Sequence, residues 1–207
     1  MSGVVVGFDL DMTLVDSRPG IRACFAALAR ETGLDVLNDP DLIDRALRRT
    51  LDGEFALLFP PGDAARHADR FRELYIEHGV PGTSPLPGSD AAIAAVQDCG
   101  GRVIVLTAKY EPNAKRCLDH VSLRADLIIG GRWGDSKATA IRDHGVALYV
   151  GDTMADMHAA NDAGAIALGV STGLDSADEL RGAGANFVFA SLHEFPTWFA
   201  RHTAPRS

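Results

Sequence analysis

The sequence is poor in the residues that build thiolate metal centres, disulfide frameworks and membrane spans. Among its 207 residues it has only Cys24, Cys99 and Cys117, an odd number without Cys-x-x-Cys spacing. These three indicate core or free thiols in a reducing compartment. The seven histidines form no His-x-His or His-Glu-x-x-His group, which argues against a zinc site. No apolar run approaches the ~20 residues that cross a bilayer.

Positive charge is also scarce. The formal net charge of −8 argues against a general nucleic-acid binder, because phosphate backbones are bound by basic faces. A small anionic substrate remains compatible with it, since one local cation and a metal ion can outweigh a distant acidic surface. No basic n-region follows Met1, so we expect no signal peptide, no membrane association and a cytoplasmic location.

Short apolar runs rich in β-branched residues recur along the chain. They lack polar alternation, which is typical of strands covered on both faces of a parallel sheet. The runs cover residues 4–8, 103–106, 127–129, 147–150, 165–170 and 187–190. Helix-like segments lie between them, from Ser89 to Gly100 and at about 112–121, 137–144, 154–163 and 177–183. This alternation predicts an α/β fold with a doubly wound, Rossmann-like parallel sheet.

Residues 15–87 interrupt that rhythm. Apolar residues from Ile21 to Leu28 follow helical spacing, with Ser17 as a possible N-cap and Gly33 as the stop. The sequence therefore predicts an all-helical module inserted after the first strand, with residues 1–14 and 88–207 forming the α/β core. Ligands of open α/β sheets bind beyond the carboxyl ends of the strands, so the module would cover the site.

Asp9 and Asp11 follow the first buried strand two positions apart. An extended backbone would direct both carboxylates to one face. At ~6 Å and an effective dielectric of ~20, their repulsion would cost about 3 kcal/mol. A divalent cation would remove that cost, because such ions prefer clustered oxygen ligands. A strand that ends in polar turn residues would explain the pair equally well.

Two single residues add weaker signals. Thr107 ends the strand 103–106, where a hydroxyl and backbone N–H groups can hold phosphate oxygens, although it can also simply end a strand. Lys137 is one of only three lysines against seventeen arginines. It lies in the first turn of a predicted helix, where the helix dipole disfavours a cation unless an anion binds nearby. A solvated surface lysine is the alternative.

The segment Gly151-Asp152-Thr153-Met154-Ala155-Asp156 follows another buried strand. Thr153 and Asp156 match a capping box, which accounts for Asp156 without any ligand. Asp152 has no such explanation. A carboxylate at the end of a buried strand needs a partner, and a metal ion is a natural one.

In this order and at these positions, the four motifs resemble those of the haloacid dehalogenase superfamily. The helical insertion resembles the cap of the subgroup that includes phosphoglycolate phosphatases and β-phosphoglucomutases. The resemblance implies a Mg²⁺-dependent phosphatase of a small phosphorylated metabolite, working through an aspartyl-phosphate. It implies Asp9 as nucleophile and Asp11 as general acid and base. It further implies phosphate binding by Leu10, Thr107, Ala108 and Lys137, and a metal site at Asp9, Asp11 (through its carbonyl), Asp152 and Asp156.

Three positions depart from the family pattern. Met12 stands where glycine is usual, Ala108 replaces a common asparagine, and no proline follows Lys137. None of them removes a catalytic group. Residues 14–88 contain no lysine, which excludes relatives that use a cap lysine as a Schiff base. The open alternatives are phosphotransfer on the same core, as in a sugar-phosphate mutase or to another acceptor, and a non-enzymatic phosphate-binding module.

Substrate choice is expected to lie in the cap. The turn from Arg48 to Glu54 is the candidate specificity loop, with a solvated helix end as the alternative. We expect Arg66, Arg70 and Arg72 to form an exposed helix face. We expect Trp133 to cover the core, with a place in the pocket lining as the alternative. The oligomeric state is left open between a monomer and a homodimer.

Overall fold

The structure, a computed structural model, describes residues 3–203. Its centre is a six-stranded parallel sheet with the strand order β5-β4-β1-β6-β7-β8. The strands are β1 (Val5–Phe8), β4 (Arg102–Leu106), β5 (Leu127–Ile129), β6 (Leu148–Gly151), β7 (Ile166–Val170) and β8 (Phe187–Phe189). Strand β1 pairs with both β4 and β6, so the first predicted motif lies at the middle of the sheet.

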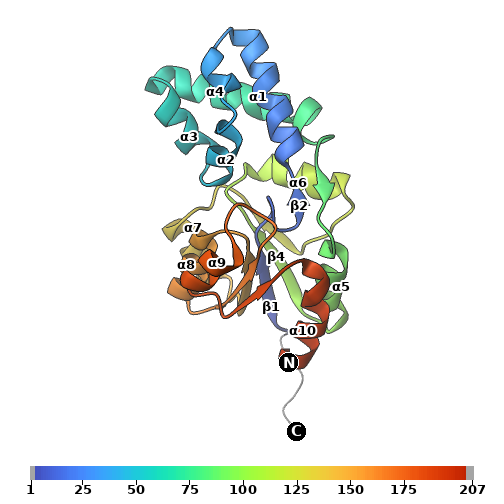
Figure 1. The fold of residues 1–207 in the computed structure, drawn as a ribbon. Helices are drawn as coiled ribbons and strands as arrows, with labels where there is room; N and C mark the ends of the chain where they lie inside the picture. Colours follow the sequence, from blue (N-terminus) through green and yellow to red (C-terminus); the bar gives the residue numbers. More distant parts are fainter. Residues whose placement is uncertain (1–2, 204–207) are drawn as a thin grey trace.

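Helices cover both faces of this sheet (Figure 1). They are α5 (Ser89–Asp98), α6 (Glu111–His120), α7 (Asp135–Asp143), α8 (Met154–Ala163), α9 (Ala177–Gly182) and α10 (Phe195–Thr203), with the short turn η3 (Leu192–Glu194) before α10. Helices α5 and α10 lie on one face, and α7, α8 and α9 on the other. The predicted doubly wound α/β fold is confirmed.

The period-two geometry of the strands sends alternate apolar side chains into two different cores. In β4, Val103 and Val105 pack with α5 and α10, whereas Ile104 and Leu106 pack with α7 and α8. All four side chains are fully buried. The strands are therefore apolar without interruption, which is the pattern that indicated a sheet covered on both sides.

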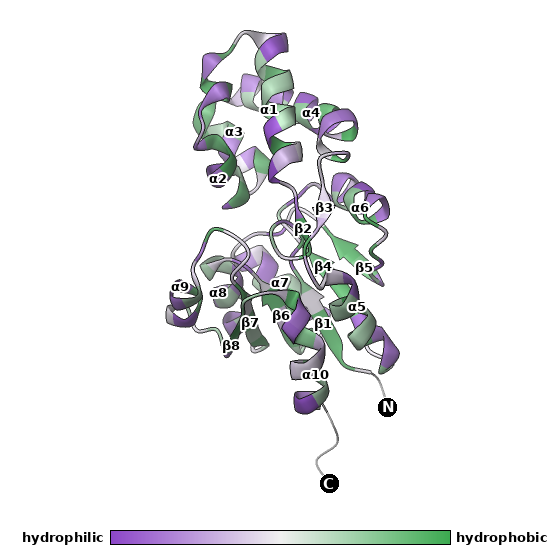
Figure 2. Ribbon diagram, turned by 45° about the vertical axis from the view of Figure 1, so that its right-hand side comes forward, coloured by the Kyte–Doolittle hydropathy of each residue, from purple (hydrophilic) through white to green (hydrophobic). Residues whose placement is uncertain are grey.

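A helical module, α1 to η2, lies between β1 and α5 in the chain. It consists of α1 (Arg18–Thr32), η1 (Asp35–Asn38), α2 (Leu42–Leu47), α3 (Leu51–Leu58), α4 (Pro61–Leu74) and η2 (Tyr75–Gly79). The module has its own hydrophobic cluster, in which Phe25, Phe55 and Phe71 pack ring against ring. Figure 2 shows the hydrophobic residues of the sheet and of the module as two separate concentrations. The exact boundaries of the two predicted domains stay a prediction.

Helix α1 has the limits that the sequence indicated, but the predicted N-cap hydrogen bond is not formed. Gly33 ends it in the left-handed conformation, with φ of 68°. Ser17 occupies the N-cap position, but its buried hydroxyl has no hydrogen-bond partner among residues 3–203. The Asp16 carboxylate accepts the Arg18 N–H instead, at 3.1 Å.

The module stands over the carboxyl end of β1 (Figure 1). The chain enters it through β2 (Val15–Asp16) and leaves through β3 (Ser84–Pro85), and these two strands pair in an antiparallel ladder. None of the helices within residues 3–203 has the length and apolar character needed to cross a bilayer.

Candidate active site

A pocket lies where the carboxyl ends of the central strands meet the helical module. Asp9, Asp11 and Thr107 line its sheet side, and Leu47 and Phe71 belong to its module side. The site is therefore made by two parts of the chain that are separate in sequence. This is the position expected for a ligand of an open α/β sheet.

Three carboxylates converge at the sheet side of the pocket. Asp9 follows β1, Asp152 follows β6, and Asp156 lies in the first turn of α8. Each offers one oxygen, and these oxygens lie within 4.8 Å of one another. The Asp9 N–H donates to the Val150 carbonyl at 2.8 Å, so the pairing of β1 with β6 continues one residue past β1 and brings the acids together.

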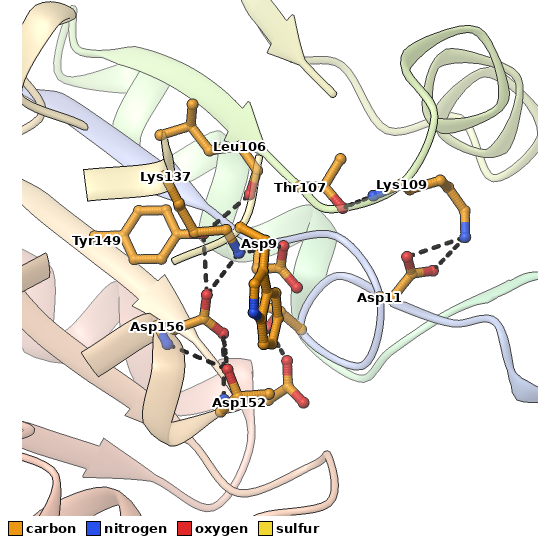
Figure 3. A network of polar contacts seen from close by, with 12 residues as sticks. Asp9, Asp11, Leu106, Thr107, Lys109, Lys137, Tyr149, Asp152 and Asp156 are labelled. Carbon is orange, nitrogen blue, oxygen red and sulfur yellow. Dashed lines mark hydrogen bonds and ion pairs between the residues drawn. The ribbon is translucent and has the colours of Figure 1, made fainter. Parts of the chain in front are cut away.

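Lys137 is the cation of this cluster (Figure 3). Its Nζ lies 3.1 Å from Asp9 Oδ1 and 2.7 Å from Asp156 Oδ1. It lies in the first turn of α7 and is 1% exposed, so it is not a solvated surface lysine. Burial alone would lower the pKa of Lys137, but the carboxylates of Asp156 and Asp9 raise it well above its ordinary value.

The cluster carries more negative than positive charge. Burial raises the pKa of Asp9 to about 7, although Lys137 opposes that shift. Burial, together with the charges of Asp156 and Asp9, also raises the pKa of Asp152 well above its usual range. Three buried carboxylates share one ammonium, which is the charge balance of a site that fits a divalent cation.

Position 173 shows how closely the chain is packed around Asp152. A Cβ on Gly173 would lie 1.8 Å from Asp152 Oδ2, so any larger residue would displace the carboxylate. From the other side, the Thr13 hydroxyl donates to Asp152 Oδ1 at 2.9 Å. Thr13 has no exposed surface. Together, glycine and hydroxyl leave Asp152 little freedom to turn away from Asp9.

Asp156 forms the capping box that the sequence suggested and also contacts the buried lysine. Its Oδ2 accepts the N–H and the hydroxyl of Thr153 in a capping box, at 3.2 and 2.7 Å. Its Oδ1 pairs with Lys137 and lies 3.4 Å from the hydroxyl of Tyr149. One carboxylate therefore orients the start of α8 and the buried lysine at the same time.

Residues predicted to bind phosphate lie beside this cluster. Thr107 is buried after β4; its hydroxyl accepts the Lys109 N–H at 3.2 Å, and its own N–H is already used by the Ile129 carbonyl. Ala108 lines the pocket. The Leu10 side chain is fully buried in the core, so only its backbone can face a ligand.

Asp11 lies apart from the three clustered acids (Figure 3). Strand β1 ends at Phe8, so the extended geometry that would align Asp11 with Asp9 does not continue. The carboxylate accepts two hydrogen bonds from Lys109 Nζ, at 2.8 and 3.0 Å. The same Nζ lies 4.6 Å from the ring centre of Tyr75, which belongs to the module. Sequence reasoning missed Lys109; its rarity as one of three lysines was the available signal.

Met12, which replaces the usual glycine, adopts the left-handed conformation with φ of 62°. This costs a non-glycine residue about 1 kcal/mol. Its side chain is buried and its carbonyl accepts the Thr172 hydroxyl at 2.6 Å. The turn therefore keeps a glycine-type backbone, with tertiary contacts holding the larger side chain.

Two expectations about single residues are wrong. Trp133 lines the pocket, and Lys137 Nζ lies 5.7 Å from its ring centre, so it does not merely cover the core. Arg72 also lines the pocket instead of joining Arg66 and Arg70 on an exposed face. Its helix turns this position toward α6, where the guanidinium lies 5.0 Å from the centre of the Tyr110 ring.

Comparison with known proteins agrees with this arrangement. The model of the haloacid dehalogenase-like hydrolase family matches residues 6–170. The chain belongs to the haloacid dehalogenase-like hydrolase family. A phosphoglycolate phosphatase from Caulobacter vibrioides is 26% identical, with 95% of this chain and 90% of that protein covered. One from Cereibacter sphaeroides (strain ATCC 17029) is 34% identical, with 79% and 82% covered.

Solved structures show the same fold. A haloacid dehalogenase-like hydrolase from Streptococcus pneumoniae superposes with a TM-score of 0.80 at 22% identity, covering 96% of this chain and 99% of that one. A predicted phosphatase from Clostridium acetobutylicum has a TM-score of 0.79 at 23% identity, with 97% and 100% covered. The expected family is confirmed, and so is the expected class of enzyme, a phosphatase of the haloacid dehalogenase type.

Proposed function

We propose that this protein is a Mg²⁺-dependent phosphatase that hydrolyses a small-molecule phosphomonoester through an aspartyl-phosphate on Asp9. The observation that carries the proposal is the convergence of Asp9, Asp152 and Asp156 around one lysine, at the edge of a pocket that also contains Thr107. A carboxylate nucleophile, an excess of acidic ligands and a phosphate-binding hydroxyl are the parts that this reaction needs.

The acidic cluster supplies the candidate metal ligands. Asp9 and Asp152 would hold Mg²⁺ through their carboxylates and Asp11 through its backbone carbonyl, while Asp156 would act through a water or by orienting Lys137. The ion would neutralise the negative charge of the phosphate and of the attacking carboxylate. The fit rests on the chemistry of the donors, since hard oxygen ligands in excess suit a hard divalent ion.

The remaining roles belong to groups around Asp9. One Asp9 oxygen would attack phosphorus in line while Thr107, Ala108 and Lys137 hold the phosphoryl oxygens. The ester oxygen leaves with a proton, which Asp11 would supply. Asp11 would later accept a proton from the water that hydrolyses the aspartyl-phosphate. To do so it must leave the position in which Lys109 holds it.

A small phosphorylated metabolite is the proposed substrate class, as the names of the curated relatives suggest. The helical module would close over it and keep out bulk water. We propose a cytoplasmic enzyme, monomeric or homodimeric; the free thiols of Cys24, Cys99 and Cys117 support a reducing compartment.

Phosphate release from a panel of sugar phosphates, nucleotides, phosphoglycolate, p-nitrophenyl phosphate and pyrophosphate, with and without Mg²⁺, tests the proposal. We expect Mg²⁺-dependent turnover over many cycles on at least one phosphomonoester. Phosphate moved to an organic acceptor, with little release to water, would favour a phosphotransferase. No Mg²⁺-dependent turnover on any ester would favour a phosphate-binding module.

A further inference from the structure

Asp175 is a buried carboxylate that has no part in the proposed reaction. It lies in the loop of residues 171–176, between β7 and α9. Its Oδ1 accepts a hydrogen bond from Arg48 at 2.8 Å, and its Oδ2 accepts the N–H of Met154 at 2.7 Å. A buried charge is costly without partners, so these two bonds fix where the Asp175 side chain lies.

The bond to Met154 acts on the segment that carries two of the clustered acids. Met154 is the first residue of α8 and lies midway between Asp152 and Asp156 in the chain. The first N–H groups of a helix lack partners within the helix, and a carboxylate is a favourable partner for them. By holding the backbone at Met154, Asp175 therefore fixes how the two acids are spaced.

The rest of the same loop contacts other parts of the acidic cluster. The Thr172 hydroxyl donates to the carbonyl of Met12 at 2.6 Å, next to the Asp11 carbonyl that is a proposed ligand of Mg²⁺. Gly173 packs directly against Asp152, since the Asp152 carboxylate leaves no room for a Cβ at this position. The loop of residues 171–176 thus touches the segments that carry three of the four proposed ligands.

The other oxygen of Asp175 connects this loop to the helical module. Arg48 is the C-cap of α2, and Figure 1 shows α2 at the end of the module that faces the core. The Arg48 side chain is 43% exposed, whereas that of Asp175 is 2% exposed. If the module moved away, Arg48 would be hydrated, but Asp175 would be left as a buried carboxylate without its counter-charge. The loop would then have to shift or admit water, and the acids packed against it would shift as well.

From these contacts we infer that Asp175 is a positioning residue of the proposed Mg²⁺ site, and that its pairing with Arg48 makes the affinity for the ion depend on the position of the module. The inference rests on the proposed function, because it takes the acidic cluster as the Mg²⁺ site, and it makes that site responsive to the module. Such a coupling is reciprocal: bound Mg²⁺ must in turn favour the arrangement in which Arg48 contacts Asp175.

Isothermal titration calorimetry with MgCl₂ tests the first half of the inference. Asp175→Ala removes both bonds and should raise the Kd for Mg²⁺ about tenfold, since residues behind metal ligands typically contribute about 10- to 100-fold to metal affinity. Arg48→Ala keeps the bond to Met154 and should raise the Kd about threefold, because solvent partly screens the lost pair. Asp178→Ala and Arg66→Ala are the matched controls: both side chains are exposed, pair within their own helices and should leave the Kd unchanged.

A double variant separates positioning from general destabilisation. If Arg48 acts through Asp175, adding Arg48→Ala to Asp175→Ala should raise the Kd no further, whereas independent effects would multiply to about 30-fold. Hydrogen exchange tests the reciprocal half. Saturating Mg²⁺ should slow amide exchange at residues 48–53 of the module by at least about threefold in the parent, and should not do so in Asp175→Ala.

The same Kd in the parent, Arg48→Ala and Asp175→Ala would overturn the inference and leave the phosphatase function standing. So would multiplying effects in the double variant, or exchange at residues 48–53 of the parent that Mg²⁺ does not change. If Asp175→Ala does not fold, Arg48→Ala decides: an unchanged Kd overturns the inference, and a threefold increase supports it. If the parent neither binds Mg²⁺ nor releases phosphate from p-nitrophenyl phosphate, the proposed function itself is wrong and the inference falls with it.

Discussion

At the scale of single residues, Asp9 has conflicting requirements. As the proposed nucleophile it would have to be ionised to attack phosphorus, yet burial raises its pKa to about 7. Lys137, 3.1 Å away, favours the ionised form, and a bound cation would favour it further. The acidic neighbours that make Asp9 costly as a carboxylate are the groups that would bind this cation.

Replacing Asp9 tests the nucleophile directly. Asp9→Asn should abolish turnover while the circular dichroism spectrum stays unchanged, because the amide has the same size and is not nucleophilic. Asp178→Asn is the control, since the Asp178 side chain is 94% exposed and does not line the pocket. Substantial remaining turnover in Asp9→Asn would falsify the covalent route.

Replacing lysines tests the cation of the site. Lys137→Ala should lower kcat/KM by more than about 100-fold, because a preorganised charge beside the phosphoryl group is removed. Lys115→Ala should leave activity unchanged, since Lys115 is 65% exposed and pairs with Asp119 one helical turn away. Equal losses in the two variants, measured as phosphate release, would show that Lys137 has no special role.

Single residues also show where sequence reasoning stops. Asp9, Asp152 and Lys137 were identified because each follows a strand or opens a helix that a parallel sheet aligns at one edge. The sequence did not indicate that Lys109, Thr13 and Tyr149 contact the acidic residues of the site. Their roles depend on which way a side chain turns after the strand ends, and no periodicity in the sequence specifies that direction.

At the scale of elements, the end of α2 is tied to the core next to the site. Arg48 donates to Asp175 Oδ1 at 2.8 Å. The other oxygen of Asp175 accepts the N–H of Met154, the first residue of α8. One buried carboxylate thus connects the helical module to the helix that presents Asp156. We expect this pair to favour the closed arrangement of module and core.

Removing the pair should weaken substrate binding more than chemistry. Arg48→Ala should raise KM about fivefold with a smaller change in kcat, because Arg48 is 43% exposed and solvent screens its pairing with the buried Asp175 to about 1 kcal/mol. Arg66→Ala, an exposed arginine paired within its own helix, is the control. Steady-state kinetics that show the same KM in both variants would contradict a role in closure.

The elements themselves were more predictable than their contacts. The six strands of the sheet and the helices α5 to α9 match the predicted segments to within a few residues, because both faces of a buried strand exclude polar side chains. Helix α10 was not predicted. The order of the strands and the turn of α4 that brings Arg72 into the pocket were not predictable. They depend on packing between segments that are distant in the chain.

At the scale of the whole molecule, a chain with a net charge of −8 concentrates three buried acids in one place. Hydrophobic packing on both faces of the sheet must hold these acids together while no cation is bound. Raised pKa values at Asp9 and Asp152 show that the arrangement disfavours their ionised forms. Stability and metal binding should therefore be linked across the fold.

This linkage gives a thermal prediction. Mg²⁺ at about 100 times its dissociation constant should stabilise the native state by about 2.7 kcal/mol. For a chain of this size that corresponds to a Tm increase of roughly 5–10 °C, measured by differential scanning fluorimetry and reversed by EDTA. Asp152→Asn should lose the increase, because it removes a ligand, whereas Asp178→Asn should keep it.

The metal-free proteins provide the opposite comparison. Without Mg²⁺, Asp152→Asn should unfold at the same temperature as the parent or higher, since a neutral amide relieves the repulsion among buried carboxylates and can still accept the Thr13 hydroxyl. A metal site at Asp152 therefore predicts that the variant is at least as stable as the parent in EDTA and less stable than the parent in Mg²⁺. The same Mg²⁺-induced shift in parent and variant would mean that the ion binds elsewhere, and that the acidic cluster only orients Lys137.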